Sequence, residues 1–284
     1  MFVIIGIVVV FGSIVVGYTM HHGDLAILWQ LNEFIIIGGA ALGSMLIANP
    51  LNVTIGVFKG VIGTLKGSKL TKATYLELMQ LLFELFNFAK REGVIALEPH
   101  IENPSSSSIF TKYPTFLGNH HATDFLCDTL KIVLGGGASP YDLEELMDID
   151  LETAHREELQ VPTALATVSD AFPGLGIVAA VLGVIITMGI IDQPPAVIGS
   201  SVGAALVGTF FGVLMAYGVV GPIAKNMENA VHEAEHYMTA IKVALLSFAK
   251  GSPASVSVEF ARRSIPPHIR PSFKETEEAT KKAR

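Results

Sequence analysis

The sequence is poor in charge for its length. Asp, Glu, Lys and Arg make up only 16% of its 284 residues, while half of the residues are hydrophobic and the mean hydropathy is +0.51. Soluble globular domains carry roughly 25% charged residues. The composition therefore argues against a soluble protein. The net charge of −7, with acidic and basic residues interspersed, gives no basic surface of the kind that binds nucleic acid.

Cysteine is almost absent as well. Cys127 is the single cysteine, so an intramolecular disulfide is excluded. A lone thiol in a region that we place in the cytosol fits a reducing compartment. We interpret Cys127 as a packing residue.

Lys and Arg are missing from residues 1–58 and 157–224, and the long apolar runs lie in these two stretches. A helix needs roughly 20 apolar residues to cross the hydrocarbon core of a bilayer. Four segments qualify: residues 2–20, 34–49, 172–191 and 196–222. No basic residue precedes the first segment, which favours a permanent span over a cleaved signal.

The loops between the paired spans, 21–33 and 192–195, contain no basic residue, whereas basic residues flank the other span ends. This bias places both termini and residues 50–170 in the cytoplasm. We predict an all-α integral membrane protein with four transmembrane helices. Its expected regions are a hairpin over 1–49, a helical cytoplasmic insert over 50–170, a second hairpin over 171–222, and a cytoplasmic helical extension over 223–284.

Local patterns refine the cytoplasmic regions. Polar residues at helical spacing over 72–91 predict an amphipathic helix, and the Pro- and Ser-rich stretch 101–114 predicts an irregular connector. The triple glycine within 134–140 lacks the Lys-Ser/Thr of a phosphate-binding loop, so we interpret it as a turn before an acidic helix. We expect a helix from Pro222 to about Lys250, and a mobile tail from Glu275 onward.

Ionisable residues are absent from the interiors of the four predicted spans. Such residues usually mark ion pathways in membranes, so we expect that the chain alone cannot relay protons through charged groups. The spacings Gly39-x-x-x-Gly43, Gly199-x-x-x-Gly203 and Gly208-x-x-x-Gly212 favour close helix contacts, within one bundle or between chains.

Three residues of the second hairpin can be interpreted either as functional residues or as ordinary structural ones. Pro173 and Pro222, near the predicted cytoplasmic face, are either hinges or simple helix ends. Thr209, within a densely apolar segment, offers a hydroxyl to an ion or to a partner, but a threonine inside a helix commonly bonds its own i−4 carbonyl.

The segment Ala205-Leu-Val-Gly-Thr209-Phe-Phe-Gly212, with Pro222 further on, resembles the MotA stator subunits of the bacterial flagellar motor. Ile101-Glu-Asn-Pro104 and Ser169-Asp-x-x-Pro173-x-x-Gly176 extend the resemblance over nearly the whole chain. It implies a multi-pass protein of the inner membrane. Several copies, five by the family pattern, would surround a MotB dimer that supplies the ion-binding aspartate and a peptidoglycan anchor.

The resemblance also implies roles for individual residues. Thr209 and Ala180 would line the ion path, and Pro173 and Pro222 would couple ion binding to a conformational change. Gly176, Gly208 and Gly212 would pack the helices, while Lys90, Arg91 and Glu98 would face the rotor protein FliG. Sodium-driven relatives tend to have an added threonine hydroxyl beside the position of Thr209, where this chain has Gly208, with Ala180 opposite, so the expected ion is the proton, with no cofactor.

Two alternatives remain open. The TolQ and ExbB energisers share the last two spans, but they typically have three spans in total. His232-Glu233-x-x-His236 matches the H-E-x-x-H pattern of zinc metalloproteases. Because a zinc site needs a further protein ligand that no partner motif supplies, we predict neither a metal site nor an enzyme.

Overall fold

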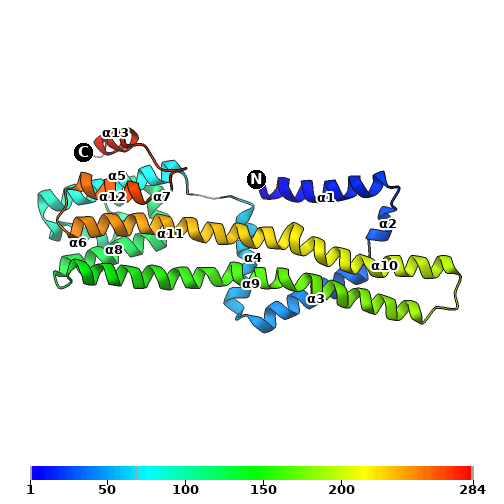
Figure 1. Ribbon diagram of the computed structural model, residues 1–284. Coiled ribbons are helices and arrows are strands. Elements are labelled where there is room, and N and C mark those ends of the chain that lie inside the picture. The colour runs from blue at the N-terminus through cyan, green and yellow to red at the C-terminus, as the bar shows by residue number, and fades with distance from the viewer. Residues whose placement is uncertain (1, 68–69, 283–284) are drawn as a thin grey trace. The chain divides into compact units, whose positions relative to one another are not determined.

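The computed structural model describes residues 2–67 and 70–282, and every regular element in these residues is a helix (Figure 1). The chain divides into two compact units. Met1–Gly67 and Glu157–Ala230 form the first, here called the membrane unit. Ser68–Arg156 and Val231–Arg284 form the second, here called the polar unit. The expectation of an all-α chain is confirmed for the described residues.

Among the residues that the structure describes, four helices are long and apolar enough to cross a membrane, as predicted. The membrane unit contains α1 (Phe2–Met20), α2 (Leu25–Leu28), α3 (Leu31–Ala48), α4 (Leu51–Thr64), part of α9 (Pro140–Met188), α10 (Pro195–Leu214), a π-helical segment (Met215–Val220) and the start of α11 (Gly221–Ala249). No residue of α1 is buried within the chain. It touches α2 and the π-helical segment, but most of its apolar side chains are exposed, so α1 depends on lipid or on another polypeptide to cover the rest.

The helix boundaries correct the expectation for the two prolines. Pro173 lies inside α9 instead of opening a span, and Pro222 lies in the first turn of α11, directly after the π-helical segment, instead of closing one. A proline removes one helical hydrogen bond, but neighbouring helices in a bundle can compensate for that loss. The helix α9 therefore continues through Pro173, whereas α11 begins beside Pro222 and runs on to Ala249.

The core of the membrane unit also includes α4. Val53 and Val57 of α4 are buried together with Ile37 of α3 and with Leu165 and Val168 of α9. Residues 51–64 and the adjoining part of α9 therefore pack with the apolar helices, although the sequence pattern groups them with the insert.

The polar unit contains α5 (Lys72–Glu92), α6 (Glu98–Glu102), α7 (Pro114–Leu117), α8 (His120–Gly135), α12 (Ala254–Ser264), α13 (Phe273–Lys282) and the remaining parts of α9 and α11, with three short 3-10 turns at Val94–Leu97, Pro104–Ser106 and Phe110–Lys112. Large apolar side chains of α5, α8 and α11 form its core. The predicted irregular connector is thus a series of short helical turns.

The amphipathic helix expected over 72–91 is confirmed as α5. Thr71 and Thr74 form a reciprocal capping box at its start. Lys90 and Arg91 lie in its last turn, where cations interact favourably with the helix dipole. Gly93 follows with a φ of +91°, a conformation that favours glycine, and ends the helix.

The expected turn after α8 is also present. Gly136 adopts the left-handed conformation with a φ of +65° and caps α8, and α9 begins at Pro140. Cys127 lies buried in α8, and burial raises the pKa of its thiol to about 12. The thiol is therefore protonated and unreactive at neutral pH, in agreement with a packing role.

The prediction of a mobile tail from Glu275 is wrong for the described residues. Residues 273–282 form α13, which packs on α5. The Glu275 carboxylate accepts a hydrogen bond from Lys72 at 2.7 Å, and the Gln80 amide donates to the Ala279 carbonyl at 3.1 Å. Thr276 and Thr280 are buried, so α13 has a contact face that its highly charged sequence conceals.

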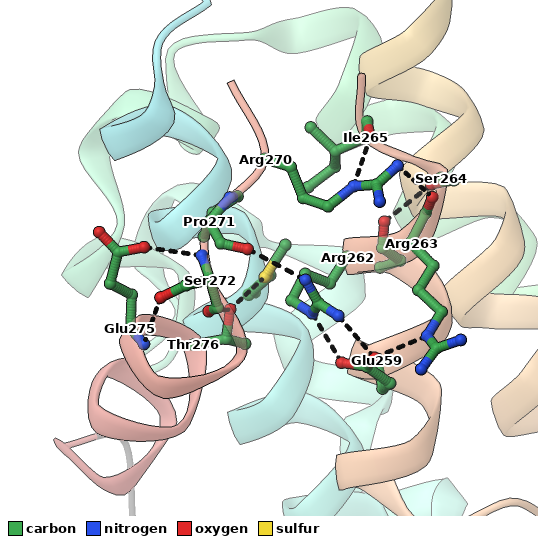
Figure 2. Close-up of polar contacts among 12 residues, drawn as sticks. Glu259, Arg262, Arg263, Ser264, Ile265, Arg270, Pro271, Ser272, Glu275 and Thr276 are labelled. Atoms are coloured by element: carbon green, nitrogen blue, oxygen red, sulfur yellow. Dashed lines mark hydrogen bonds and ion pairs between the residues drawn. The ribbon is translucent and has the colours of Figure 1, made fainter. Parts of the chain in front are cut away.

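Arginine side chains hold the segment between α12 and α13 (Figure 2). Arg262 donates to the Pro271 carbonyl at 3.1 Å, and Arg270 donates to the Ile265 carbonyl at 2.8 Å. Arg262 also pairs with Glu259 through two hydrogen bonds of 2.7 Å, and Arg263 pairs with the same carboxylate. These guanidinium groups lower the pKa of Glu259 to about 2.

Candidate functional site in the membrane unit

The helices α9 and α10 approach each other at four glycines, Gly176, Gly183, Gly208 and Gly212. A Cβ atom built on Gly176 would lie 2.7 Å from the Gly208 carbonyl oxygen, and one built on Gly212 would lie 2.5 Å from the carbonyl oxygen of Phe172. Side-chain carbon atoms do not come this close to backbone atoms. The two backbones are therefore in direct contact, and any larger residue at 176 or 212 would force them apart.

Ala180 and Thr209 lie at the same level of this helix pair. The Ala180 nitrogen lies 3.3 Å from the Cβ position of Gly208, and the Thr209 Cα lies 3.2 Å from that of Gly176. Both residues are half-buried. Within the described residues, the Thr209 hydroxyl has no hydrogen-bond partner, whereas Thr187 on α9 bonds its own i−4 carbonyl at 2.8 Å. Thr209 is therefore available to another group.

Glu33 is a member of this site that the sequence reasoning missed. The predicted span starts at residue 34 and leaves Glu33 in the loop before it, whereas α3 begins at Leu31 and includes Glu33 in its first turn. An acidic residue is favourable there because of the helix dipole. Glu33 therefore lies at the end of a candidate span, in its first helical turn, while the interior of α3 beyond it carries no ionisable residue.

The carboxyl group of Glu33 is lodged between α9 and α10. Only 8% of the residue is exposed, and among the described residues its Oε2 atom has no hydrogen-bond partner. A Cβ built on Gly208 would overlap Oε2, and one built on Gly183 would lie 3.8 Å from Oε1. The small residues of both helices thus create the space that the carboxyl group fills. Buried acids in membrane proteins usually mark functional sites.

A hydrogen bond links the regions of the two prolines. The Ser169 hydroxyl, one turn before Pro173, donates to the Ala216 carbonyl at 2.9 Å, and Ala216 belongs to the π-helical segment before Pro222. A Cβ on Gly221 would lie 2.7 Å from the same carbonyl oxygen. The Ser169 hydroxyl thus gives the Ala216 carbonyl a hydrogen-bond donor at the point where the helix changes to π-helical hydrogen bonding.

The residues expected to face the rotor lie in the polar unit. Lys90 and Arg91 are exposed at the end of α5, and Glu98 is exposed at the start of α6. Arg91 forms an ion pair of 3.4 Å with Glu92, and both side chains are at least half exposed. A short 3-10 turn over Val94–Leu97 separates the two helices. The arrangement presents charges of both signs to solvent.

The H-E-x-x-H alternative does not correspond to a ligand cluster. His236 is exposed, whereas Glu233 lies near Tyr75 on α5, where burial, together with the negative charge of Glu233, raises the pKa of Tyr75 to about 12. The group of potential ligands found in the described residues is instead His155, His232 and Glu235. The two histidines of the motif therefore do not converge on one site.

Comparison of the sequence with known proteins shows which family the chain resembles. Residues 4–93 match the family model described as Motility protein A N-terminal, and residues 119–240 match that of the MotA/TolQ/ExbB proton channel family. Motility protein A of Salmonella typhimurium is 38% identical over 285 aligned residues, covering 100% of this chain and 96% of that protein. The protein of the same name from Escherichia coli is 39% identical, with coverages of 98% and 94%.

Solved structures share the fold. The structure of C. jejuni MotAB matches with a TM-score of 0.78 at 20% identity, covering 95% of this chain and 98% of the matched chain. The flagellar MotAB stator complex from Bacillus subtilis matches with a TM-score of 0.75 at 21% identity, with coverages of 97% and 98%. The match to the Motility protein A N-terminal model also favours the stator relatives over the TolQ and ExbB branch.

Proposed function

The chain belongs to the Motility protein A family, and on this premise we propose that it is a stator subunit of the bacterial flagellar motor. The observation that carries the proposal is the match over the full chain at 38–39% identity. The chain is a multi-pass inner-membrane protein, and the distribution of basic residues supports cytoplasmic N- and C-termini.

A partner of the MotB type completes the ion path in this proposal. Five copies of the chain surround a MotB dimer, and the partner's aspartate lies beside Thr209 and Ala180. A carboxylate in a low-dielectric path favours its neutral form, so binding and release of a cation change the local charge by one unit. The membrane potential contributes roughly 2.3 kcal/mol per charge per 100 mV to this cycle.

The prolines support a link between ion binding and motion. Pro173 and Pro222 interrupt helical hydrogen bonding on either side of the Ser169–Ala216 bond. A change in α9 at this level therefore acts on the π-helical segment and on the start of α11. In the proposed cycle, that motion turns ion passage into force on the rotor.

Motility tests the proposal directly. A strain that lacks its own stator subunit should be flagellated but paralysed, and this gene with its partner should restore swimming. Pro173→Ala should fail to restore it, although the protein still accumulates in the membrane. Swimming that is unaffected by loss of the gene would overturn the proposal.

The ion is proposed to be the proton, because the site offers Gly208, with Ala180 opposite, where sodium-driven relatives have an added hydroxyl. Replacing sodium with potassium at constant pH should leave the swimming speed unchanged. Rotation that stops without sodium would reverse this assignment.

Rotor contact is proposed for Lys90, Arg91 and Glu98. Lys90→Glu should lower torque, and a matching charge reversal on the rotor protein FliG should restore it. Lys274→Glu is the control, because the Lys274 side chain is 85% exposed on α13 and lies outside this surface. An equal loss of torque in both variants would contradict a specific contact.

Glu33 provides a sharper test of the ion path. Glu33→Gln keeps the shape of the side chain but removes its ability to ionise, so we expect normal protein levels and a severalfold loss of swimming speed. Asp24→Asn is the control, since Asp24 is an exposed acid in the preceding loop. Full motility of Glu33→Gln would show that the buried carboxyl group serves packing alone.

A further inference from the structure

We propose that His155, His232 and Glu235 of the polar unit form a binding site for a divalent transition-metal ion, with zinc as the preferred ion. His155 comes from α9, whereas His232 and Glu235 come from α11. The site shares no residue with the site around Glu33 in the membrane unit, so it is independent of the proposed motor function.

The spacing of the three side chains fits zinc coordination. The distance from His155 Nδ1 to Glu235 Oε2 is 3.4 Å, and that from His232 Nδ1 to the same oxygen is 3.5 Å. Zinc bonds of about 2.0–2.1 Å in a tetrahedron place neighbouring ligand atoms about 3.4 Å apart. All three ligand atoms lie within 4.8 Å of one another. A small rotation of the half-exposed His232 side chain would close the longest separation.

The ring of His155 carries a second indication. Its Nδ1 atom is buried and, among the described residues, has no hydrogen-bond partner, although Glu235 Oε2 lies only 3.4 Å away. Buried polar atoms in native proteins are nearly always paired. An ion between the two groups would give both a ligand bond where their hydrogen-bond geometry is poor.

The donor set selects the class of ion. Two imidazoles and one carboxylate suit zinc and its neighbours in the transition series, whereas magnesium and calcium prefer oxygen donors alone. The neighbouring Arg156 forms an ion pair with Glu152, so its charge is balanced one turn away. The side chains of His155, His232 and Glu235 are 20%, 45% and 41% exposed, which leaves the site open to ions from solution.

This site differs from the protease motif that the sequence suggests. It uses the first histidine of the motif and a glutamate three residues later, which share one face of α11. The exposed His236 is not among its ligands. With three protein ligands and water in the fourth position, the ion would connect α9 to α11 and restrict their relative movement at this point.

Metal binding can be measured on the full-length chain with its partner, purified in detergent through a tag that contains no histidine. After treatment with a chelator, zinc chloride is titrated against a chromophoric zinc indicator. We expect one zinc ion per chain. His155→Gln and Glu235→Gln should each weaken binding at least tenfold, whereas His236→Gln should leave it unchanged.

Two results would overturn the proposal: less than one zinc ion per ten chains in the unaltered protein, or equal weakening by His236→Gln and His155→Gln. Hydrogen exchange of the unaltered chain provides a readout that requires no variant. Zinc should slow exchange in α11 near residue 232 and leave α8 unchanged, although α8 begins with His120 and His121. Motility is scored separately, so failure of the metal site leaves the stator proposal intact.

Discussion

Glycine serves different purposes in the two units of this protein. In the membrane unit, Gly176 and Gly212 are needed because a side chain would collide with the backbone of the facing helix. In the polar unit, Gly93 and Gly136 have no neighbour within 4 Å of a Cβ position, but they adopt positive φ angles at helix ends. Gly176 and Gly212 allow two helices to approach closely, whereas Gly93 and Gly136 allow the backbone to turn at the end of a helix.

The buried side chains differ in the same way. The core of the polar unit contains large residues such as Tyr75, Phe86, Phe110 and Tyr237. That of the membrane unit has several alanines, among them Ala179, and much of its helix contact is backbone against backbone. Water drives apolar burial in the polar unit, whereas lipid gives little such driving force. The membrane unit should therefore be sensitive to added volume, and the polar unit to lost burial and lost charge pairing.

The largest effect is expected from added volume between α9 and α10. Gly212→Ala would place a methyl group against the Phe172 carbonyl oxygen and within 3.0 Å of the Gly176 Cα. Overpacking of this kind costs about 1–3 kcal/mol, and we expect complete loss of swimming on soft agar. Gly203→Ala, on the same helix with nothing within 4 Å, is the control and should swim. Normal motility of Gly212→Ala would contradict the expectation that the membrane unit is sensitive to added side-chain volume.

A smaller effect should follow loss of a charge pair in the polar unit. Arg262 and Arg263 hold the pKa of Glu259 at about 2, below its usual 4.5. A lowered pKa in the folded state adds stability that is full above pH 4.5 and disappears as the pH falls toward 2. The difference between a pKa of 4.5 and one of about 2 corresponds to about 3 kcal/mol at neutral pH, and solvent at the partly exposed pair reduces this value.

Urea unfolding followed by circular dichroism would measure this contribution. We expect Glu259→Gln to lower the free energy of unfolding by about 2 kcal/mol at pH 7, with a smaller difference at pH 3. Glu278→Gln is the control, because Glu278 and Lys274 form an exposed pair 3.9 Å apart and such pairs contribute about 0–1 kcal/mol. A pH-independent difference would argue against the charge pairing.

The smallest effect is expected at the bond between the proline regions. Ser169→Ala removes the donor to the Ala216 carbonyl, and single hydrogen bonds inside membrane proteins contribute about 0.6 kcal/mol on average. We expect a slightly lower unfolding midpoint in SDS and a drop in torque at high load. Ser44→Ala, which loses only a bond to Ala41 on the same helix, should keep its torque. Equal torque in the two variants would remove the case for coupling through Ser169.

Hydropathy was sufficient to find the four apolar helices, because bilayer thickness sets a length that the sequence displays directly. It placed the start of α3 too late and so assigned Glu33 to a loop. An acid beside an apolar run looks like a boundary, and its burial depends on Gly183 and Gly208, far away in the sequence. Periodicity likewise found α5, but the docked face of α13 consists of buried threonines that hydropathy does not reveal.

The prolines illustrate a further limit. Sequence rules end helices at proline because one hydrogen bond is lost, whereas α9 continues through both Pro162 and Pro173. The compensating Ser169–Ala216 bond joins residues 47 positions apart. Local sequence pattern cannot predict such a contact. The same holds for the pair of His155 and Glu235, which are also far apart in the sequence.

The docked position of α13 has a practical consequence for work in living cells. A fluorescent protein fused after residue 284 would be joined to a helix that touches Lys72, Met79 and Gln80 of α5. The same α5 ends at Lys90 and Arg91. A bulky label would strain the contact between α13 and the first half of α5, the helix that carries the proposed rotor residues at its other end, so microscopy of the working motor is better served by a tag elsewhere in the complex.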